Sequence, residues 1–131
     1  PDKVAARIYY NDKESHDIYA GSDFYLMPSI SEPCGISQLI AMRYGSLPIV
    51  REAGGLKDTV IPYNEYTGEG TGYSFANINA HELLFAAKNA VEVYNNKKDV
   101  HRHLIENAMK QKNDWEMSSE KYLELYERIK A

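Results

Sequence analysis

The chain has 131 residues, 44% of them hydrophobic and 26% charged, with a formal net charge of −4. Its length predicts one domain, 1–131, with enough apolar residues to bury a core. The scattered, mildly acidic charge argues against a nucleic-acid partner, and no run approaches the ~20 apolar residues that cross a membrane. Because Cys34 is the only cysteine, no internal disulfide is expected and a reducing cytoplasmic setting is favoured. Without a Cys/His cluster nearby, no metal site is predicted.

Short apolar runs alternate with segments of helical periodicity along most of the chain. In chain order, the predicted elements are a strand at 4–10, a helix at 13–20, a strand at 24–27, a helix at 36–44, a strand at 47–50, a helical or extended piece at 56–61, a strand at 72–75 and helices at 80–94, 100–111 and 117–129. Such alternation is typical of parallel β-α units. The predicted fold class is therefore α/β: a partial Rossmann-like parallel sheet of about four strands with flanking helices, ending in three helices.

The helices after Ala80 carry apolar residues at helical spacing, which predicts that they pack against a core. In helix 80–94 the predicted core face consists of Leu83, Leu84, Ala87, Val91 and Tyr94. Trp115 is expected to pack in the core as well.

The stretch 28–38 joins a predicted strand to the helix that follows it, through a turn that contains Pro and Gly. In an open α/β sheet such a turn lies at the carboxyl edge, where ligands bind, and here it presents the carboxylate of Glu32. The free N–H groups at the helix start, near Gly35, Ile36 and Ser37, suit the oxygens of an anion such as a phosphate. Ordinary strand–turn–helix units share this pattern, so a purely structural turn is the alternative interpretation.

Three motifs carry a resemblance to one enzyme family. They are Ser29-x-x-Glu32-Pro33-Cys34-Gly35-x-x-Gln38-Leu39, Ala41-Met42-Arg43-Tyr44-Gly45-Ser46-x-Pro48-Ile49-Val50-Arg51 and Gly54-Gly55-Leu56-x-Asp58-Thr59-Val60. The motifs resemble those of bacterial glycogen synthases and plant starch synthases, retaining glycosyltransferases of family 5 with the two-domain GT-B fold. The resemblance extends upstream to Tyr10 and downstream to Tyr126, and so covers essentially the whole chain.

The resemblance implies transfer of glucose from ADP-glucose to the non-reducing end of an α-1,4-glucan, with retention at the anomeric carbon. It also implies that the chain is the distal part of the C-terminal, nucleotide-sugar-binding domain. The expected partners are ADP-glucose or ADP, the glucan acceptor and an N-terminal GT-B domain, and no cofactor is implied besides the substrate. We expect the chain, which begins at Pro1, to be a piece of a longer protein of the bacterial cytoplasm or the plastid stroma, and to be inactive alone.

By this resemblance, Glu32 is the essential carboxylate placed against the donor glucose. A negative group at that place stabilises the positive charge that develops at the anomeric carbon in an oxocarbenium-like transition state. Many related GT-B transferases carry a second Glu eight residues further on, where this chain has Ile40. The lack of a carboxylate pair argues against a double-displacement mechanism built on these residues.

Further roles come from the same resemblance. Cys34 and Gly35 match positions whose backbone amides reach the hydroxyls of the donor sugar. Ile36 and Ser37 match the first helical residues, whose N–H groups take the distal phosphate, with an ordinary helix start as the alternative. Tyr10 matches an aromatic residue that stacks on adenine, and a packed aromatic at a strand end is its alternative. Base stacking tolerates any base, so Tyr10 alone does not select ADP over UDP.

Several other positions are expected to support this site. His16 matches a family position and is interpreted as structural or as a supporting residue. Gly54 and Gly55 are expected to shape the floor of the site, because glycine allows close approach of a backbone. Arg51 and Asp58 are interpreted either as charges that orient the site or as members of a local salt bridge.

Two alternative functions stay open at this stage. One is a retaining GT-B transferase that uses a different nucleotide sugar, and the other is a non-catalytic nucleotide- or glucan-binding module. In GT-B proteins the C-terminal helix crosses to the other domain, so one face of 117–129 is expected to be exposed here. An exposed apolar face of this kind favours self-association.

Overall fold

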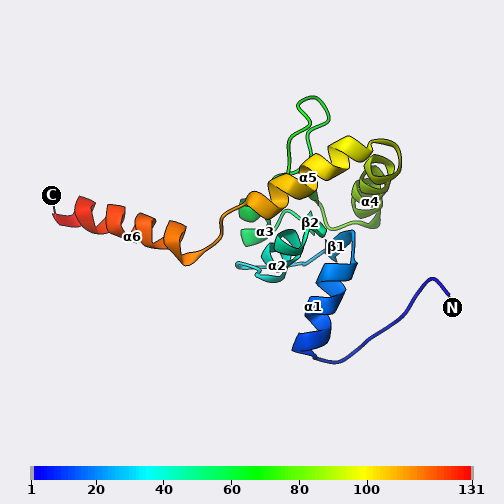
Figure 1. The fold of residues 1–131 in the computed structure, drawn as a ribbon, viewed down its shortest axis with the longest axis horizontal. Coiled ribbons are helices and arrows are strands. Elements are labelled where there is room, and N and C mark those ends of the chain that lie inside the picture. The colour runs from blue at the N-terminus through cyan, green and yellow to red at the C-terminus, as the bar shows by residue number, and fades with distance from the viewer. Residues whose placement is uncertain (1, 131) are drawn as a thin grey trace.

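The computed structural model describes residues 2–130 and contains helices and strands in alternation, followed by helices alone (Figure 1). The elements are α1 (Asp12–Gly21), β1 (Phe24–Met27), α2 (Ser37–Tyr44), β2 (Leu47–Arg51), α3 (Gly55–Thr59), β3 (Tyr73–Phe75), α4 (Ala80–Asn96), α5 (Lys98–Lys110) and α6 (Trp115–Lys130). The predicted α/β class with three closing helices is confirmed.

The three strands form one parallel sheet in the order β1-β2-β3. Phe24 pairs with Leu47 across the first ladder, and Ile49 pairs with Tyr73 across the second. The crossover from β1 to β2 contains α2, and the crossover from β2 to β3 contains α3. All strands therefore end at the same carboxyl edge of the sheet, which is where α/β proteins place their ligand sites.

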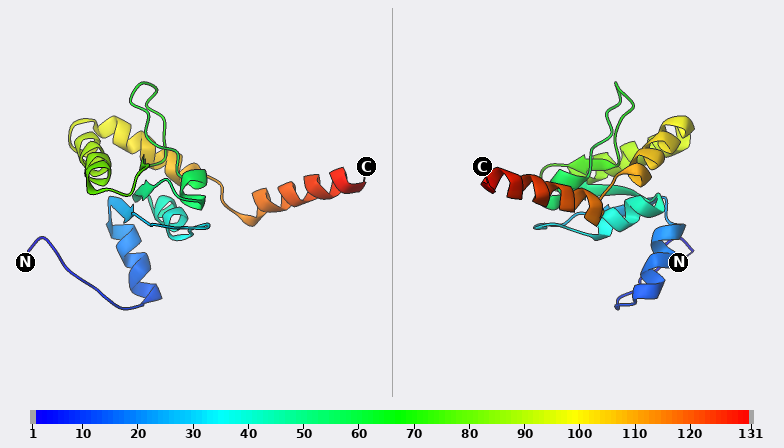
Figure 2. Two further views of the ribbon diagram at one scale, coloured as in Figure 1. Left: turned by 180° about the vertical axis from the view of Figure 1, so that it is seen from behind. Right: turned by 60° about the vertical axis from the view of Figure 1, so that its left-hand side comes forward.

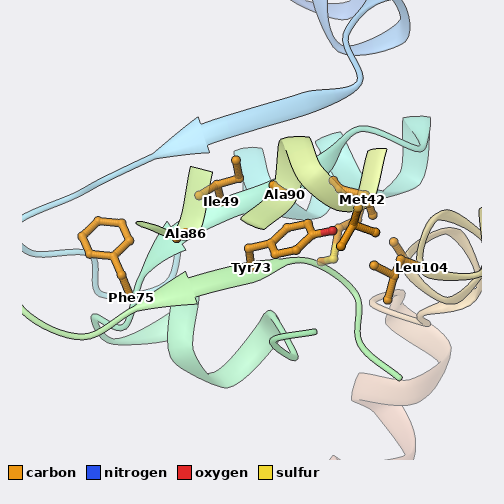
Figure 3. Close-up of a cluster of buried hydrophobic side chains, with 10 residues drawn as sticks. Met42, Ile49, Tyr73, Phe75, Ala86, Ala90 and Leu104 are labelled. Atoms are coloured by element: carbon orange, nitrogen blue, oxygen red, sulfur yellow. The ribbon is translucent and has the colours of Figure 1, made fainter. Parts of the chain in front are cut away.

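The two faces of the sheet bury different sets of residues, because neighbouring side chains on a strand point to opposite faces. Ile49 belongs to the larger core, which includes residues of α4 and α5, and Val50 belongs to a smaller cluster with Leu56 and Val60 of the α3 segment. In Figure 3 the ring of Tyr73 lies among the buried side chains of that larger core. The larger cluster consists of Met42, Leu47, Ile49, Tyr73, Phe75, Ala86, Ala90, Val93, Leu104 and Ala108.

The predicted strand at 4–10 is wrong, because this segment has no regular structure. Val4 is 76% exposed and Ile8 is 95% exposed, and no strand within residues 2–130 pairs with them. A strand needs a neighbour to satisfy its backbone, so apolar composition alone does not make one. Figures 1 and 2 show this N-terminal segment running clear of the sheet.

The predicted core face of α4 is partly wrong. The buried residues are Ala86, Ala90 and Val93, whereas Leu84 and Val91 are about half exposed. The alanines are small enough to bring the helix backbone close to the sheet, so the buried stripe is centred on them rather than on the largest side chains. The size of the apolar side chains therefore does not predict which face of α4 is buried.

Core packing was also predicted for Trp115 and the last helix, and this is wrong for the described chain. Trp115 is 85% exposed, and α6 has no buried residue. Figures 1 and 2 both show α6 projecting away from the body of the molecule. Its apolar side, including Tyr122 and Ile129, is exposed as expected. Self-association through this helix stays a prediction.

No helix within residues 2–130 has the length and apolar character needed to span a membrane.

The start of α4 is fixed by reciprocal hydrogen bonds of the capping-box type. The Asn79 side-chain oxygen accepts from the backbone N–H of Glu82 at 2.8 Å. The Glu82 carboxylate in turn accepts from the backbone N–H groups of Asn77 (2.8 Å) and Ala76 (3.1 Å), and from both asparagine side chains. These donors, first of all the backbone N–H of Asn77, lower the pKa of Glu82 from 4.5 to about 2.

We predict that Glu82→Gln lowers the melting temperature at neutral pH, because only the charged carboxylate receives this set of bonds in full. A carboxyl whose folded-state pKa is depressed stabilises the fold above its unfolded pKa and loses that effect as the pH falls through its folded pKa. The difference between wild type and variant should thus be complete above pH 4.5 and shrink toward about pH 2. Thermal unfolding followed by circular dichroism across this range tests it.

Glu92→Gln is the matched control, since Glu92 is exposed on the same helix and makes no hydrogen bond within residues 2–130. An equal loss of stability in both variants, or a pH-independent difference for Glu82→Gln, would contradict the prediction.

Candidate functional site

The loop that follows β1 lies at the carboxyl edge of the sheet and contacts the start of α3. The backbone N–H of Gly55 lies 3.3 Å from the carbonyl oxygens of both Glu32 and Pro33. The side-chain Nε2 of Gln38 donates to the carbonyl of Gly35 at 2.8 Å and lies 3.3 Å from that of Cys34. Four successive carbonyl groups of the turn therefore point into the protein.

This arrangement determines where the N–H groups of the turn point. In a trans peptide the C=O and N–H of one unit point in opposite directions, and residues 2–130 contain no cis peptide. Inward carbonyls at Pro33, Cys34 and Gly35 thus direct the N–H groups of Cys34, Gly35 and Ile36 outward. No described residue accepts a hydrogen bond from these N–H groups. The sequence-based prediction of free amides at this place agrees with this geometry.

The loop is also held from the end of β2. The Arg51 guanidinium donates to the backbone carbonyls of Ile30 at 2.5 Å and Ser29 at 3.2 Å. Within the described chain Arg51 forms no salt bridge, and its bonds hold the backbone of the loop, while a role in orienting a ligand stays a prediction. Asp58, for which the same two roles were predicted, is exposed on α3.

Glycines permit the close contact between this loop and α3. A Cβ atom added at Gly54 would overlap the backbone oxygen of Glu32, and one at Gly55 would overlap that of Cys34. Gly54 also has φ +46, a conformation that other residues rarely adopt. The glycine pair thus forms the surface on which the Glu32 turn rests, and its place in the floor of a ligand site stays a prediction.

The side chains of the turn are accessible. Glu32 is partly buried, Cys34 is an exposed free thiol, and Ile36 is 66% exposed. The hydroxyl of Ser37 lies 3.3 Å from the sulfur of Met27, which is a weak acceptor. That hydroxyl is therefore not engaged in a strong hydrogen bond and can turn to a better acceptor.

A small pocket of about 290 Å³ adjoins the loop at the same edge of the sheet. Its lining combines the first loop residue, the β2 end and the start of α4: Pro28, Arg51, Phe75, Ile78, Asn79, Ala80 and Leu83. A larger hollow of about 700 Å³ lies between residues 62–66 and α4, and contains none of the predicted site residues. Within residues 2–130 no cluster of metal-ligating side chains is present.

Two predicted site residues lie apart from the turn. Tyr10 is 91% exposed in the irregular N-terminal segment, not at the end of a strand. The Nδ1 atom of His16 lies 3.0 Å from the hydroxyl of Tyr44, the last residue of α2. His16 is thus near the end of α2 that is remote from the turn, roughly 10 Å along the helix. It joins α1 to α2, which fits the structural interpretation.

Sequence reasoning assigned no role to Gln38 or Thr59, although both stood within the quoted motifs. Gln38 is completely buried at the start of α2. Its position offered a signal, since helical side chains lean toward the N-terminus and reach the preceding turn. Thr59 offered none, because its contact with Gln38 spans 21 residues.

Comparison with known proteins yields one family and several similar proteins. The family described as "Glycosyl transferases group 1" matches residues 2–111. The chain is 60% identical to a glycogen synthase of Finegoldia magna over 98% of the chain and 27% of that relative. It is 58% identical to a glycogen synthase of Clostridioides difficile over 98% of the chain and 26% of that protein.

A solved structure is similar as well. It is the catalytic domain of starch synthase IV from Arabidopsis thaliana, described as bound to ADP and acarbose. The match has a TM-score of 0.83 and 38% identity, and covers 92% of this chain and 25% of that chain. The chain thus spans about a quarter of the length of the relatives it matches.

We predict that Gly54→Ala destabilises the protein by about 2–4 kcal/mol, through backbone strain and the overlap with Glu32. Gly68→Ala is the control, because Gly68 also has a positive φ, +78, but nothing within 4 Å of an added Cβ. That control should lose only ~1 kcal/mol. Urea unfolding measures both, and equal losses would show that the contact with the turn contributes nothing.

Proposed function

The chain belongs to the group 1 glycosyl transferases, and from this premise we propose that it binds the nucleotide sugar of a glycogen or starch synthase. The proposed reaction transfers glucose from ADP-glucose to the non-reducing end of an α-1,4-glucan with retention. Because the chain spans about a quarter of its relatives, the reaction is proposed for a longer protein that contains it. The proposed setting of that protein is the bacterial cytoplasm or the plastid stroma.

One observation carries the proposal. The outward N–H groups of the turn at 34–36 precede the N-terminus of α2, at the carboxyl edge of a parallel sheet. Backbone N–H groups and the positive end of a helix dipole favour an anion at such a place. The similar starch synthase structure was described with ADP, which carries two phosphates.

In this proposal the turn binds the donor through its backbone. The N–H groups of Ile36 and Ser37 bind the distal phosphate, with the Ser37 hydroxyl turning from Met27 to assist. The N–H groups of Cys34 and Gly35 bind hydroxyls of the donor glucose. Because these contacts use the backbone, the conformation of the turn matters more than the identity of its side chains.

Glu32 is proposed as the catalytic carboxylate. Its main chain is fixed by the contact with Gly55, so its side chain starts from a defined position. A carboxylate there stabilises the positive charge at the anomeric carbon as the bond to the diphosphate breaks. Since Ile40 occupies the place of a second carboxylate on α2, no covalent intermediate on a paired carboxylate is proposed.

Tyr10 is proposed to stack on adenine, and its exposed ring is free to do so. We predict measurable binding of ADP to the 131-residue chain by calorimetry. Tyr10→Ala should weaken ADP binding by the equivalent of ~1–3 kcal/mol. Binding of inorganic phosphate should be unaffected.

Tyr9→Ala is the control, since the neighbouring Tyr9 hydroxyl bonds to Glu14 instead. UDP titrated in parallel measures how strictly the site prefers adenine. Folded protein that binds neither nucleotide would contradict the proposed function, whereas equal ADP affinity in both tyrosine variants would remove only the role of Tyr10.

Catalysis is best tested in a chimera that carries this chain in place of the matching segment of the Finegoldia magna glycogen synthase, which is 60% identical over 129 residues. We predict that the chimera transfers glucose from ADP-glucose to glycogen. Glu32→Gln should lower kcat by about 10²–10³-fold with little change in ADP affinity, because it removes transition-state charge stabilisation. A variant with normal kcat would show that Glu32 is not catalytic.

A further inference from the structure

Gln38 is the one completely buried polar side chain beside the turn, and its amide contacts three acceptors. Its Nε2 atom lies 2.8 Å from the Gly35 carbonyl, 3.3 Å from the Cys34 carbonyl and 3.1 Å from the Thr59 hydroxyl. Carbonyl oxygens only accept hydrogen bonds, so they require the nitrogen end of the amide as their donor. The side chain acts toward the turn purely as a donor.

The opposite end of the same amide shows that this burial is not explained by good packing alone. The Gln38 Oε1 atom is buried and finds no donor among residues 2–130. An apolar side chain would avoid the penalty of burying that oxygen without a partner. A glutamine at this position supplies N–H donors, whereas a leucine or a methionine of similar size supplies none.

Thr59 connects this amide to a second part of the fold. Its hydroxyl accepts from Gln38 and donates to the Gly55 carbonyl at 2.6 Å. The Thr59 carbonyl accepts from the side chain of Gln111, at the end of α5, at 2.9 Å. The hydrogen bonds thus run from the turn through Gln38 and Thr59 to the end of α5, which belongs to the packed body of the protein.

We propose that Gln38 is a positioning residue, held by Thr59, that keeps the Cys34 and Gly35 carbonyls inward and so aims the Gly35 and Ile36 N–H groups at the donor. The inference rests on the proposed function, which supplies the ligand. Gln38 touches no ligand itself. Its effect is conformational: without the amide, each of these two peptide units can rotate, and the N–H groups no longer converge outside the turn.

The test uses amide-resolved ¹H–¹⁵N NMR on the 131-residue chain, first without ligand and then with ADP. Gln38→Met keeps the length of the side chain but removes the donor. We expect the Gly35 and Ile36 amide resonances to move in the ligand-free variant, and its ADP dissociation constant to rise by about fivefold or more, the loss expected when buried carbonyl groups lose their hydrogen-bond donor.

Thr59 provides a pair of variants in case Gln38→Met does not fold. Thr59→Val removes the hydroxyl at constant shape, and Thr59→Ser retains it. We expect Thr59→Val to weaken ADP binding by about threefold, as for one lost hydrogen bond, and Thr59→Ser to restore it. A role in stability alone would lower the melting temperature and leave the ADP affinity of the folded protein unchanged.

The outcomes separate this inference from the proposed function. Folded Gln38→Met or Thr59→Val protein with wild-type amide shifts at Gly35 and Ile36, or with wild-type ADP affinity, overturns the positioning role while ADP binding stands. Wild-type protein whose Ile36 amide does not respond to ADP overturns the proposed function and, with it, the ligand assigned here.

Discussion

The inward orientation of four successive carbonyl groups, from Glu32 to Gly35, is the constraint on which the candidate site depends. Two donors satisfy them: the N–H of Gly55 and the amide of Gln38. Because peptide units are planar, satisfying the carbonyls on one side leaves the N–H groups on the other. The unpaired N–H groups are thus exposed because the carbonyl groups of the same peptide units are hydrogen-bonded inside. This arrangement involves only the backbone of the turn, so it does not require polar side chains there.

Hydrogen bonds from three other residues fix the same turn, and two of these residues are distant from it in the sequence. Arg51 at the end of β2 holds its beginning, Gly55 at the start of α3 holds its middle, and Gln38 holds its end. Only glycine at positions 54 and 55 allows the two backbones to meet. Such a turn is largely preorganised, which reduces the entropy that the turn itself loses when a ligand binds.

The sequence predicted those parts of the fold and of the candidate site that depend on interactions between residues close together in the chain. The strand–turn–helix around Glu32 follows from a short apolar run, a Pro- and Gly-containing turn and helical spacing, so its place at the sheet edge was predictable. The strand at 4–10 was not, because strand formation depends on a neighbour that composition does not reveal. The role of Thr59 was equally hidden, since it arises from a contact across 21 residues. The buried face of α4 shows a similar limit, because it includes Ala86 and Ala90 while Leu84 and Val91 are about half exposed.

The parallel sheet has a consequence for how the chain reaches its fold. Each ladder joins residues roughly two dozen positions apart, Phe24 with Leu47 and Ile49 with Tyr73. Closing these long loops costs chain entropy before any strand pairing is gained, and folds dominated by such non-local pairs assemble slowly. The helices α4 and α5, whose backbone hydrogen bonds are local, can form early, whereas the Glu32 turn acquires its shape only after β2 and α3 have docked. The candidate site is thus expected to be the last part of the domain to acquire its native structure during folding.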